Sequence, residues 1–407
     1  MTEIRFICPG CQHQLEGDNL LVGQEVECSS CSKVFTATFP AKSRSIPKLT
    51  VTQEKKHVDD NTDAQLIVSK VTGQVTRIAG IGKLEGFRIK EFFSEAFRKH
   101  TKDEVEEYFT VGTPSTTPDI SKVDTSWPRP WVFFRTFFST IAVYFLFVQA
   151  LKMFPNVNLV PGLIMVGSFA VPVSTLVFFM EINARRNVSL YQVLRLVFAG
   201  GIFSLIFSLT LYQMGSALQL DWLGASVAGI VEEPGKLLAL LLVVNIPKYR
   251  YTLNGLLFGA AIGTGFASFE SAGYALTAGM SAPGFDAAVI AMTDTIMERG
   301  MLSPFAHIAW TGMCGAALWK VKGERKFSIG MVGDIRFLRI FAIAVAMHML
   351  WNSPLLLTRL TYYGKFIGIG VVAWIIILAL IQDGLKQLRA EKNASSKGEE
   401  ASVPTTP

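Results

Sequence analysis

The apolar residues of this chain are concentrated in its second part. Residues before about position 126 are mostly polar, whereas residues 127–390 form long apolar runs separated by short charged loops. A run of ~20 apolar residues is long enough to cross a bilayer as a helix. The pattern predicts an all-α polytopic membrane domain with about eight transmembrane helices. The expected spans are 131–154, 160–182, 193–218, 222–246, 253–278, 287–319, 337–357 and 366–382.

The sixth expected span is too long to be a single crossing. It contains Pro304, so we expect an interfacial or broken segment followed by a true span from about Leu302. The alternate loops are rich in Lys and Arg, and the net charge of +6 agrees with basic cytoplasmic loops. No apolar signal segment begins the sequence. We therefore expect a multi-pass protein of a bacterial-type inner membrane, with both termini in the cytoplasm.

Residues 1–38 carry two Cys-x-x-Cys pairs at the spacing of a zinc ribbon. Two tight turns, each presenting two sulfurs, form a closed tetrahedral site for structural Zn2+. The short segments 25–27 and 34–36 are expected to be the arms of a hairpin. The alternatives are a redox pair or a ribbon that has lost its metal. The predicted ligands are Cys8, Cys11, Cys28 and Cys31.

The region between the ribbon and the membrane domain is expected to be a short soluble α+β region between two linkers. Polar residues 39–63 and the Pro/Thr-rich residues 113–126 are typical of linkers. Within residues 64–112, we expect one or two strands over 65–81 and an amphipathic helix over 84–108. That helix either packs on its own domain or lies on the membrane surface. Residues 391–407 are expected to be a disordered tail.

The fourth apolar run contains charges that do not belong in lipid. Glu232, Glu233 and Lys236 lie in its middle, and each charge in hydrocarbon costs at least ~2.5–3.5 kcal/mol. They must face a protein interior, a watery cavity or a metal. Pro234 removes a helical hydrogen bond beside them and is expected to open the helix.

The fourth span and the three after it each carry two polar residues four positions apart, a spacing that places both on one face of the helix. Such faces can converge on a common cavity. Carboxylates with two imidazoles form a ligand set for Zn2+ or another divalent metal, which lowers the pKa of bound water. A further glutamate could then act as general base. The pairs are Glu232/Lys236, Glu270/Tyr274, His307/Thr311 and His348/Asn352.

Other readings of these residues remain open. Tyr274 and Thr311 could simply form hydrogen bonds to neighbouring helices, and Glu298 could form an interfacial ion pair with Arg299. An ion- or proton-coupled transporter would also bury carboxylates and histidines at mid-membrane. A third alternative is a non-catalytic scaffold that recruits partners through the zinc ribbon. No nucleic-acid partner is expected.

In these motifs the sequence resembles the PrsW family of intramembrane proteases, within the superfamily that includes the CAAX prenyl proteases. The resemblance rests on four motifs in order over about 130 residues. They are Glu232-Glu233-x-x-Lys236, Phe269-Glu270 followed by Tyr274, the stretch from Arg299 through Pro304 and His307 to Trp310-Thr311, and His348-x-x-Trp351-Asn352.

The resemblance implies hydrolysis of a peptide bond in a membrane-protein substrate, such as a single-span anti-sigma factor. Glu232 or Glu233 would activate water, and Asn352 would donate to the oxyanion. Lys236 would pair with a carboxylate; because it shares a face with Glu232, we expect Glu233 to be the freer base. The implied ligands of the metal, or holders of the water in a metal-free version, are Glu270, His307 and His348.

Overall fold

The computed structural model describes most of the membrane domain and part of the N-terminal region. The described residues are 3–7, 14–18, 24–29, 31–36, 62–101, 104, 109–217, 220–354 and 359–402. The chain divides into two units, residues 1–60 and 61–407. The finer subdivision expected from the sequence stays a prediction.

The N-terminal unit contains two antiparallel hairpins. Strand β1 (Glu3–Ile7) pairs with β2 (Gln14–Asp18), and β3 (Glu25–Glu27) pairs with β4 (Val34–Thr36). The second hairpin confirms the predicted arms. Between these strands, Ser32 N donates to Cys28 O over 2.9 Å, which closes a turn that ends at Ser32. Cys8 and Cys11 lie outside the described residues, so the four-cysteine zinc site stays a prediction.

The soluble part of the second unit differs from expectation. Residues predicted as strands form helix α1 (Thr62–Ile78), which buries Thr76 and packs on α13. Within the predicted helix 84–108, the described residues form the short α2 (Ile89–Phe92), turns and a helical position at Glu104. The aromatic residues of this segment pack on α5 and Trp127 instead of forming a helical stripe.

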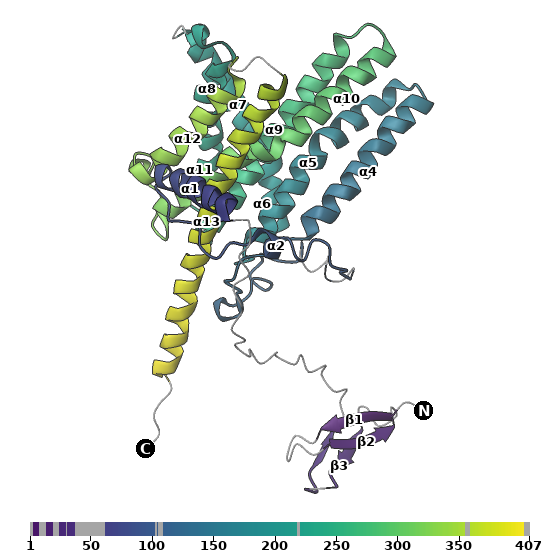
Figure 1. Cartoon of the computed structure of the whole chain (residues 1–407), viewed down its shortest axis with the longest axis vertical. Helices are drawn as coiled ribbons and strands as arrows, with labels where there is room; N and C mark the ends of the chain where they lie inside the picture. Colours follow the sequence, from purple (N-terminus) through teal and green to yellow (C-terminus); the bar gives the residue numbers. More distant parts are fainter. Residues whose placement is uncertain are drawn as a thin grey trace. The chain divides into compact units, whose positions relative to one another are not determined.

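The membrane domain is a bundle of long helices (Figure 1). Its helices are α4 (Val132–Met153), α5 (Val160–Ile182), α6 (Leu190–Arg195), the π-helical turn η4 (Leu196–Gly200), α7 (Gly201–Ala217), α8 (Val227–Leu241), α9 (Thr252–Met280), α10 (Phe285–Leu302), α11 (His307–Lys322), α12 (Ile335–Asn352) and α13 (Arg359–Ser402). The short 3-10 turns are η2 (Ile120–Lys122), η3 (Val157–Leu159), η5 (Leu220–Ser226), η6 (Ser303–Phe305) and η7 (Ile329–Met331).

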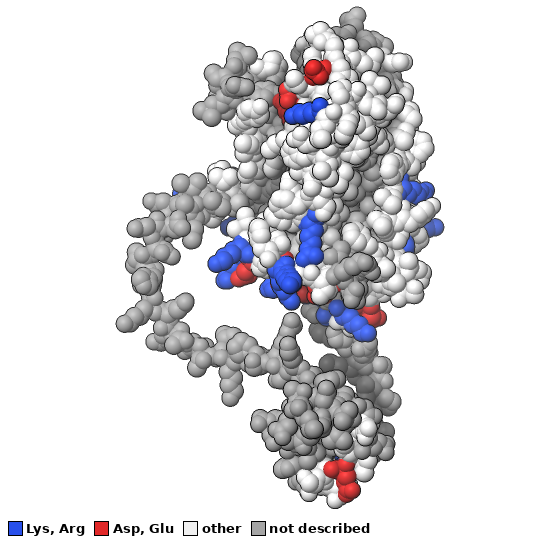
Figure 2. Space-filling model, turned by 90° about the vertical axis from the view of Figure 1, so that its right-hand side faces the viewer, with Lys and Arg blue, Asp and Glu red and all other residues white. Residues whose placement is uncertain are grey.

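Among the described residues, six helices are long and apolar enough to cross a membrane. They span 132–153, 157–182, 190–215, 252–280, 335–352 and 363–396. Helix α8 has only 15 residues, and the sixth expected span is broken at η6, as Pro304 predicted. The count of eight therefore stays a prediction. Figure 2 shows Lys and Arg gathered mainly towards one end of the helical unit, with uncharged residues over most of its length.

The C-terminal segment is helical further than expected. Helix α13 continues to Ser402, although residues 391–407 were predicted to be disordered. Its last turns are rich in Ala, Lys and Glu, which are strong helix formers even without an apolar partner.

Helix α9 is the centre of the bundle and fixes the position of α11. In its most apolar stretch of 18 residues, 94% of the residues are buried. Gly255, Gly259 and Gly263 recur every four residues and lie against the α11 backbone, where a Cβ atom would collide with carbonyl oxygens. Small residues at this spacing let two membrane helices approach closely. The α9 glycines thereby hold His307, the first residue of α11, at a fixed place in the bundle.

Candidate active site

Helix α8 brings the adjacent carboxylates into the protein interior. The helix runs through Pro234 without interruption, and Glu232, Glu233 and Lys236 are all buried. Gly235 allows α8 to lie close to Ser208 of α7, because a Cβ atom there would collide with the serine. Three charges at the packed centre of a helix bundle can persist only if they compensate one another.

Glu233 is fully engaged by its neighbours. Its Oε1 atom lies 2.6 Å from Lys236 Nζ and 2.8 Å from His348 Nδ1. The lysine is farther from Glu232, at 3.8 Å from Oε2. The expected pairing of Lys236 with Glu232 is therefore reversed, because the lysine side chain folds back towards the residue three positions away. Glu233 holds His348 as carboxylates hold metal-binding histidines.

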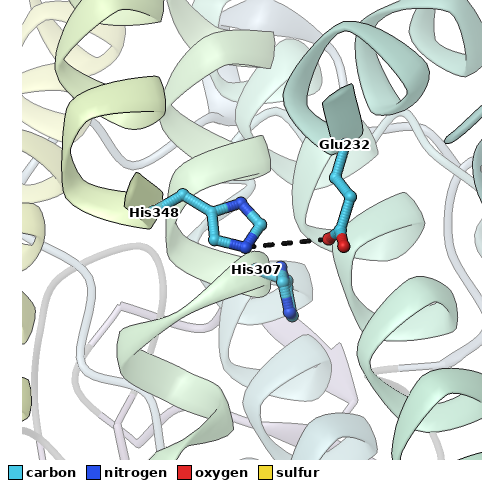
Figure 3. Close-up of side chains that lie close together, drawn as sticks. All are labelled: Glu232, His307 and His348. Carbon is cyan, nitrogen blue, oxygen red and sulfur yellow. Dashed lines mark ion pairs between the residues drawn. The ribbon is translucent and has the colours of Figure 1, made fainter. Parts of the chain in front are cut away.

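Glu232 keeps one oxygen available. Tyr212 of α7 donates its hydroxyl hydrogen to Glu232 Oε1 over 3.1 Å. The other oxygen, Oε2, is buried and has no hydrogen-bond partner among the described residues. His348 Nε2 lies 3.7 Å from this oxygen, and His307 lies beside them (Figure 3). A buried carboxylate oxygen without a partner is costly unless another species binds there.

His307 is held at both ring nitrogens. Its Nε2 lies 3.1 Å from Glu270 Oε2, and its Nδ1 lies 2.9 Å from Lys236 Nζ. Arg299 of α10 pairs with the same Glu270 oxygen, donates from Nε to Ser271 and lies over the Tyr274 ring. Arg299 therefore anchors the carboxylate behind His307, whereas the sequence suggested an interfacial pair with Glu298.

Aromatic rings enclose the two histidines. The Trp310 ring lies 4.7 Å from His348 and 5.4 Å from His307, measured between centroids, and is fully buried. The Phe266 ring lies 4.4 Å from Lys236 Nζ, a cation–π contact. These rings cover part of the charged cluster with apolar surface.

A cavity of about 530 Å³ opens onto this cluster. It is lined by many of the residues predicted from the sequence, namely Glu232, Glu270, Tyr274, Arg299, His307, His348 and Asn352. Glu233, Lys236 and Thr311 do not line it; Thr311 Oγ1 is buried without a partner among the described residues. Tyr212 and Lys365 also line the cavity although neither is expected from the sequence, where each is only a polar group on an otherwise apolar helix.

Three of the side chains are placed to hold a metal ion. Each of Glu232, His307 and His348 offers one donor atom, and these atoms all lie within 4.8 Å of one another. A metal bound by His307 would replace one of the two present contacts of its ring nitrogens, with Glu270 or with Lys236. One carboxylate and two imidazoles suit zinc or a similar divalent ion, and the orphaned Glu232 oxygen fits this use. The set differs from the expected one, because Glu270 contacts His307 and Arg299 while Glu232 lies with the histidines.

Comparison with known proteins supports this chemistry. Residues 189–381 match the model of a family described as PrsW family intramembrane metalloprotease. No curated protein and no solved structure gives a significant match. The matched range contains every residue of the polar cluster on α7 to α12. Together with the six helices among the described residues that are apolar enough to span a membrane, this match indicates a multi-pass intramembrane metalloprotease.

Proposed function

We propose that this protein hydrolyses a peptide bond of a membrane-protein substrate, and that Glu232 is the carboxylate that acts directly on the attacking water. The observation that carries the proposal is the position of Glu232 Oε2, which is buried beside two imidazoles and has no hydrogen-bond partner among the described residues. Glu233 is a poorer candidate, because Lys236 and His348 both engage it and it does not line the cavity.

His307 and His348 would hold the divalent metal that the family description implies, and Glu232, the third member of the donor group, would face the attacking water beside it. When bound, such an ion would lower the pKa of water and polarise the substrate carbonyl. The surrounding residues set the geometry: Tyr212 fixes the Glu232 carboxylate, Glu233 orients His348, and Glu270, held by Arg299, orients His307. Such outer contacts tune the ligands they touch.

The reaction requires one proton to move from water to the leaving amine. We propose that Glu232 Oε2 accepts this proton as the water oxygen attacks the carbonyl carbon, and returns it to the nitrogen when the carbon–nitrogen bond breaks. Asn352, on the cavity wall one turn after His348, is proposed to donate a hydrogen bond to the oxyanion. Lys236 compensates the negative charge of Glu233 throughout.

The finer expectations from the sequence also enter this proposal. We infer that the substrate is a single-span protein of the anti-sigma-factor kind, and that the chain lies in a bacterial-type inner membrane with both termini in the cytoplasm. The excess of Lys and Arg in alternate loops supports that orientation. We also propose that Cys8, Cys11, Cys28 and Cys31 bind a structural zinc ion, consistent with the tight turn at Cys28.

A reporter cleavage assay with matched metal analysis tests the function. The full chain is placed in liposomes with a reporter whose single membrane segment of ~20 residues consists of Leu, Ala and Gly between two soluble tags. We expect the wild type to cut the reporter and the His307→Ala/His348→Ala variant to leave it intact. Undiminished cleavage by the double variant would contradict the proposal.

The metal content is measured in a background in which the four ribbon cysteines are replaced by serine, so that only the membrane site can bind. We expect about one divalent ion per chain there, and loss of that ion when both histidines are replaced. An unchanged metal content after the histidine replacements would place the ion elsewhere.

A further inference from the structure

A second, apolar groove of about 440 Å³ lies between α4, α5 and α13. Its walls are mainly aromatic, with contributions from α2, η6 and these three helices. The lining residues that matter most are Phe134, Phe137, Phe178, Phe305 and Trp374. Pockets lined by aromatic side chains bury apolar ligands well.

The groove presents no available polar group on its α5 wall. Ser174 Oγ donates to Ala170 O over 2.6 Å, and Thr175 Oγ1 donates to Val171 O over 2.9 Å. Both hydroxyl hydrogens are therefore used within α5 itself. An occupant gains affinity here by burying hydrocarbon side chains, not by hydrogen bonding.

The turn η6 is a thin wall between this groove and the reaction cavity. Pro304 and Phe305 line the groove, while Ser303 and Ala306 on either side of them line the cavity. His307 follows directly. The groove and the cavity are therefore separated by only a few residues. A ligand that contacts Phe305 in the groove contacts the turn that directly precedes His307.

Helix α13 pins this wall in place. Trp374 Nε1 donates to Pro304 O over 3.0 Å. Gly370 lets the Phe305 ring lie against the helix, where a Cβ atom would come within 2.6 Å of Phe305 Cδ1. The contacts that form the floor of the groove are thus the contacts that fix the start of α11.

The two hollows lie at different levels of the bundle. The groove is lined by the first turns of α4 and the last turns of α5, near one end of the bundle. The cavity is lined by Tyr212 near the end of α7, by Ala225 and by the start of α8. A substrate segment of ~20 residues that places a peptide bond in the cavity is long enough to extend to the level of the groove as well.

We propose that the groove is a docking site for the transmembrane segment of the substrate, and that it binds the apolar half of that segment beyond the scissile bond. This inference rests on the proposed function. It follows from the shared wall η6 and from a lining that is apolar except for Ser174 and Thr175, whose hydroxyl hydrogens are bonded within α5. The segment recognised would present large aliphatic or aromatic side chains at helical spacing, and seating them against Phe305 and Trp374 would hold His307 in its working position.

Photo-crosslinking from two adjacent positions on α4 tests the docking site. A photoreactive phenylalanine analogue replaces Phe137, which lines the groove, or Phe138, which is 57% exposed and lies outside it. The full chain carries Glu232→Gln so that the leucine–alanine reporter binds without turnover. We expect at least fivefold more reporter crosslinked from position 137 than from 138. Equal yields, or crosslinks from 137 to lipid alone, would overturn the proposal.

Kinetics of alanine variants give a second measurement that does not depend on crosslinking. We expect Phe137→Ala to raise KM for the reporter several-fold with kcat within twofold of the wild type, and Phe138→Ala to change neither. An unchanged KM for Phe137→Ala would count against docking. The two proposals fail separately: reporter cleavage without crosslinks at 137 refutes only the docking site, and crosslinks at 137 without cleavage by the wild type refute only the proposed hydrolysis.

Discussion

Replacing Lys236 by methionine isolates the buried charge network at the centre of the site. The ammonium group lies 2.6 Å from Glu233 Oε1, 2.9 Å from His307 Nδ1 and 4.4 Å from the Phe266 ring centre. The residue is 1% exposed, so water cannot replace it. Methionine keeps the volume but leaves the Glu233 carboxylate buried without its cation.

The magnitude follows from this burial. Breaking a buried ion pair by removing one partner costs about 3–5 kcal/mol. For a domain of this size, each kcal/mol lowers the unfolding temperature by about 2–4 °C, so we expect Lys236→Met to unfold about 6–20 °C below the wild type. Adding Glu233→Gln to Lys236→Met removes the unpaired carboxylate charge, so the double variant should regain much of the lost unfolding temperature.

Thermal unfolding of the purified protein in detergent, followed by tryptophan fluorescence, measures these shifts. Lys152→Met is the matched control, because Lys152 is an exposed residue in the last turn of α4. It should unfold at the wild-type temperature. The reasoning is refuted if Lys236→Met unfolds within 2 °C (about 1 kcal/mol or less) of the wild type, or if the double variant is no more stable than the single one.

Three further predictions concern single residues. Tyr212→Phe removes the hydrogen bond to Glu232, which contributes about 1.5–3 kcal/mol because the acceptor is charged. We expect kcat to fall about 10- to 150-fold while the unfolding temperature stays unchanged. An unchanged kcat would refute the positioning role of Tyr212. The pKa of Asp334 is lowered from its ordinary 3.8 to about 2, mainly by the hydrogen bond from the Arg336 side chain and next by the hydrogen bond from the Arg336 backbone N–H. The stabilisation that Asp334 provides should therefore be complete above pH 3.8 and lost as the pH falls to about 2; the difference in unfolding temperature between wild type and Asp334→Asn should shrink over that window, and a constant difference would contradict this. Gly259→Val should force α9 away from α11 and abolish both activity and stable folding. In size-exclusion chromatography the variant should elute early as aggregates. A monodisperse and active variant would contradict the close packing of the two helices.

The sequence was sufficient to locate the membrane domain and most of the site. Charged residues in apolar helices are costly, so Glu232, Glu270, His307 and His348 were recognisable as inward-facing groups, and the structure brings all four to one cavity. The break before His307 was also predictable, because proline interrupts the helical hydrogen bonds.

The pairings within the cluster were not predictable from spacing. Positions three and four residues away on a helix are nearly equivalent, so only packing decides that Lys236 turns to Glu233. The rotation of α9 and α10 likewise determines that Arg299 reaches Glu270. Tyr212 was missed because a lone tyrosine in an apolar helix carries no chemical signal until its neighbour is known.

The soluble region shows a different limit. Residues 62–78 contain β-branched residues that favour strands locally, yet they form α1 because tertiary packing outweighs weak propensity. The aromatic residues after it were read as one helix face, but Phe92 and its neighbours are buried against Phe178 of the membrane domain. Contacts between distant segments of this kind leave no periodic pattern in the sequence.

The most direct test of the central claim is the turnover number of Glu232→Gln on the leucine–alanine reporter, compared with that of Glu298→Gln. Both residues line the cavity, but Glu298 lies outside the group of donors that could hold a metal. We expect Glu232→Gln to lower kcat at least about 100-fold and Glu298→Gln to stay within a few-fold of the wild type. A Glu232→Gln variant that turns over at the wild-type rate would contradict the assignment of Glu232 to the attacking water.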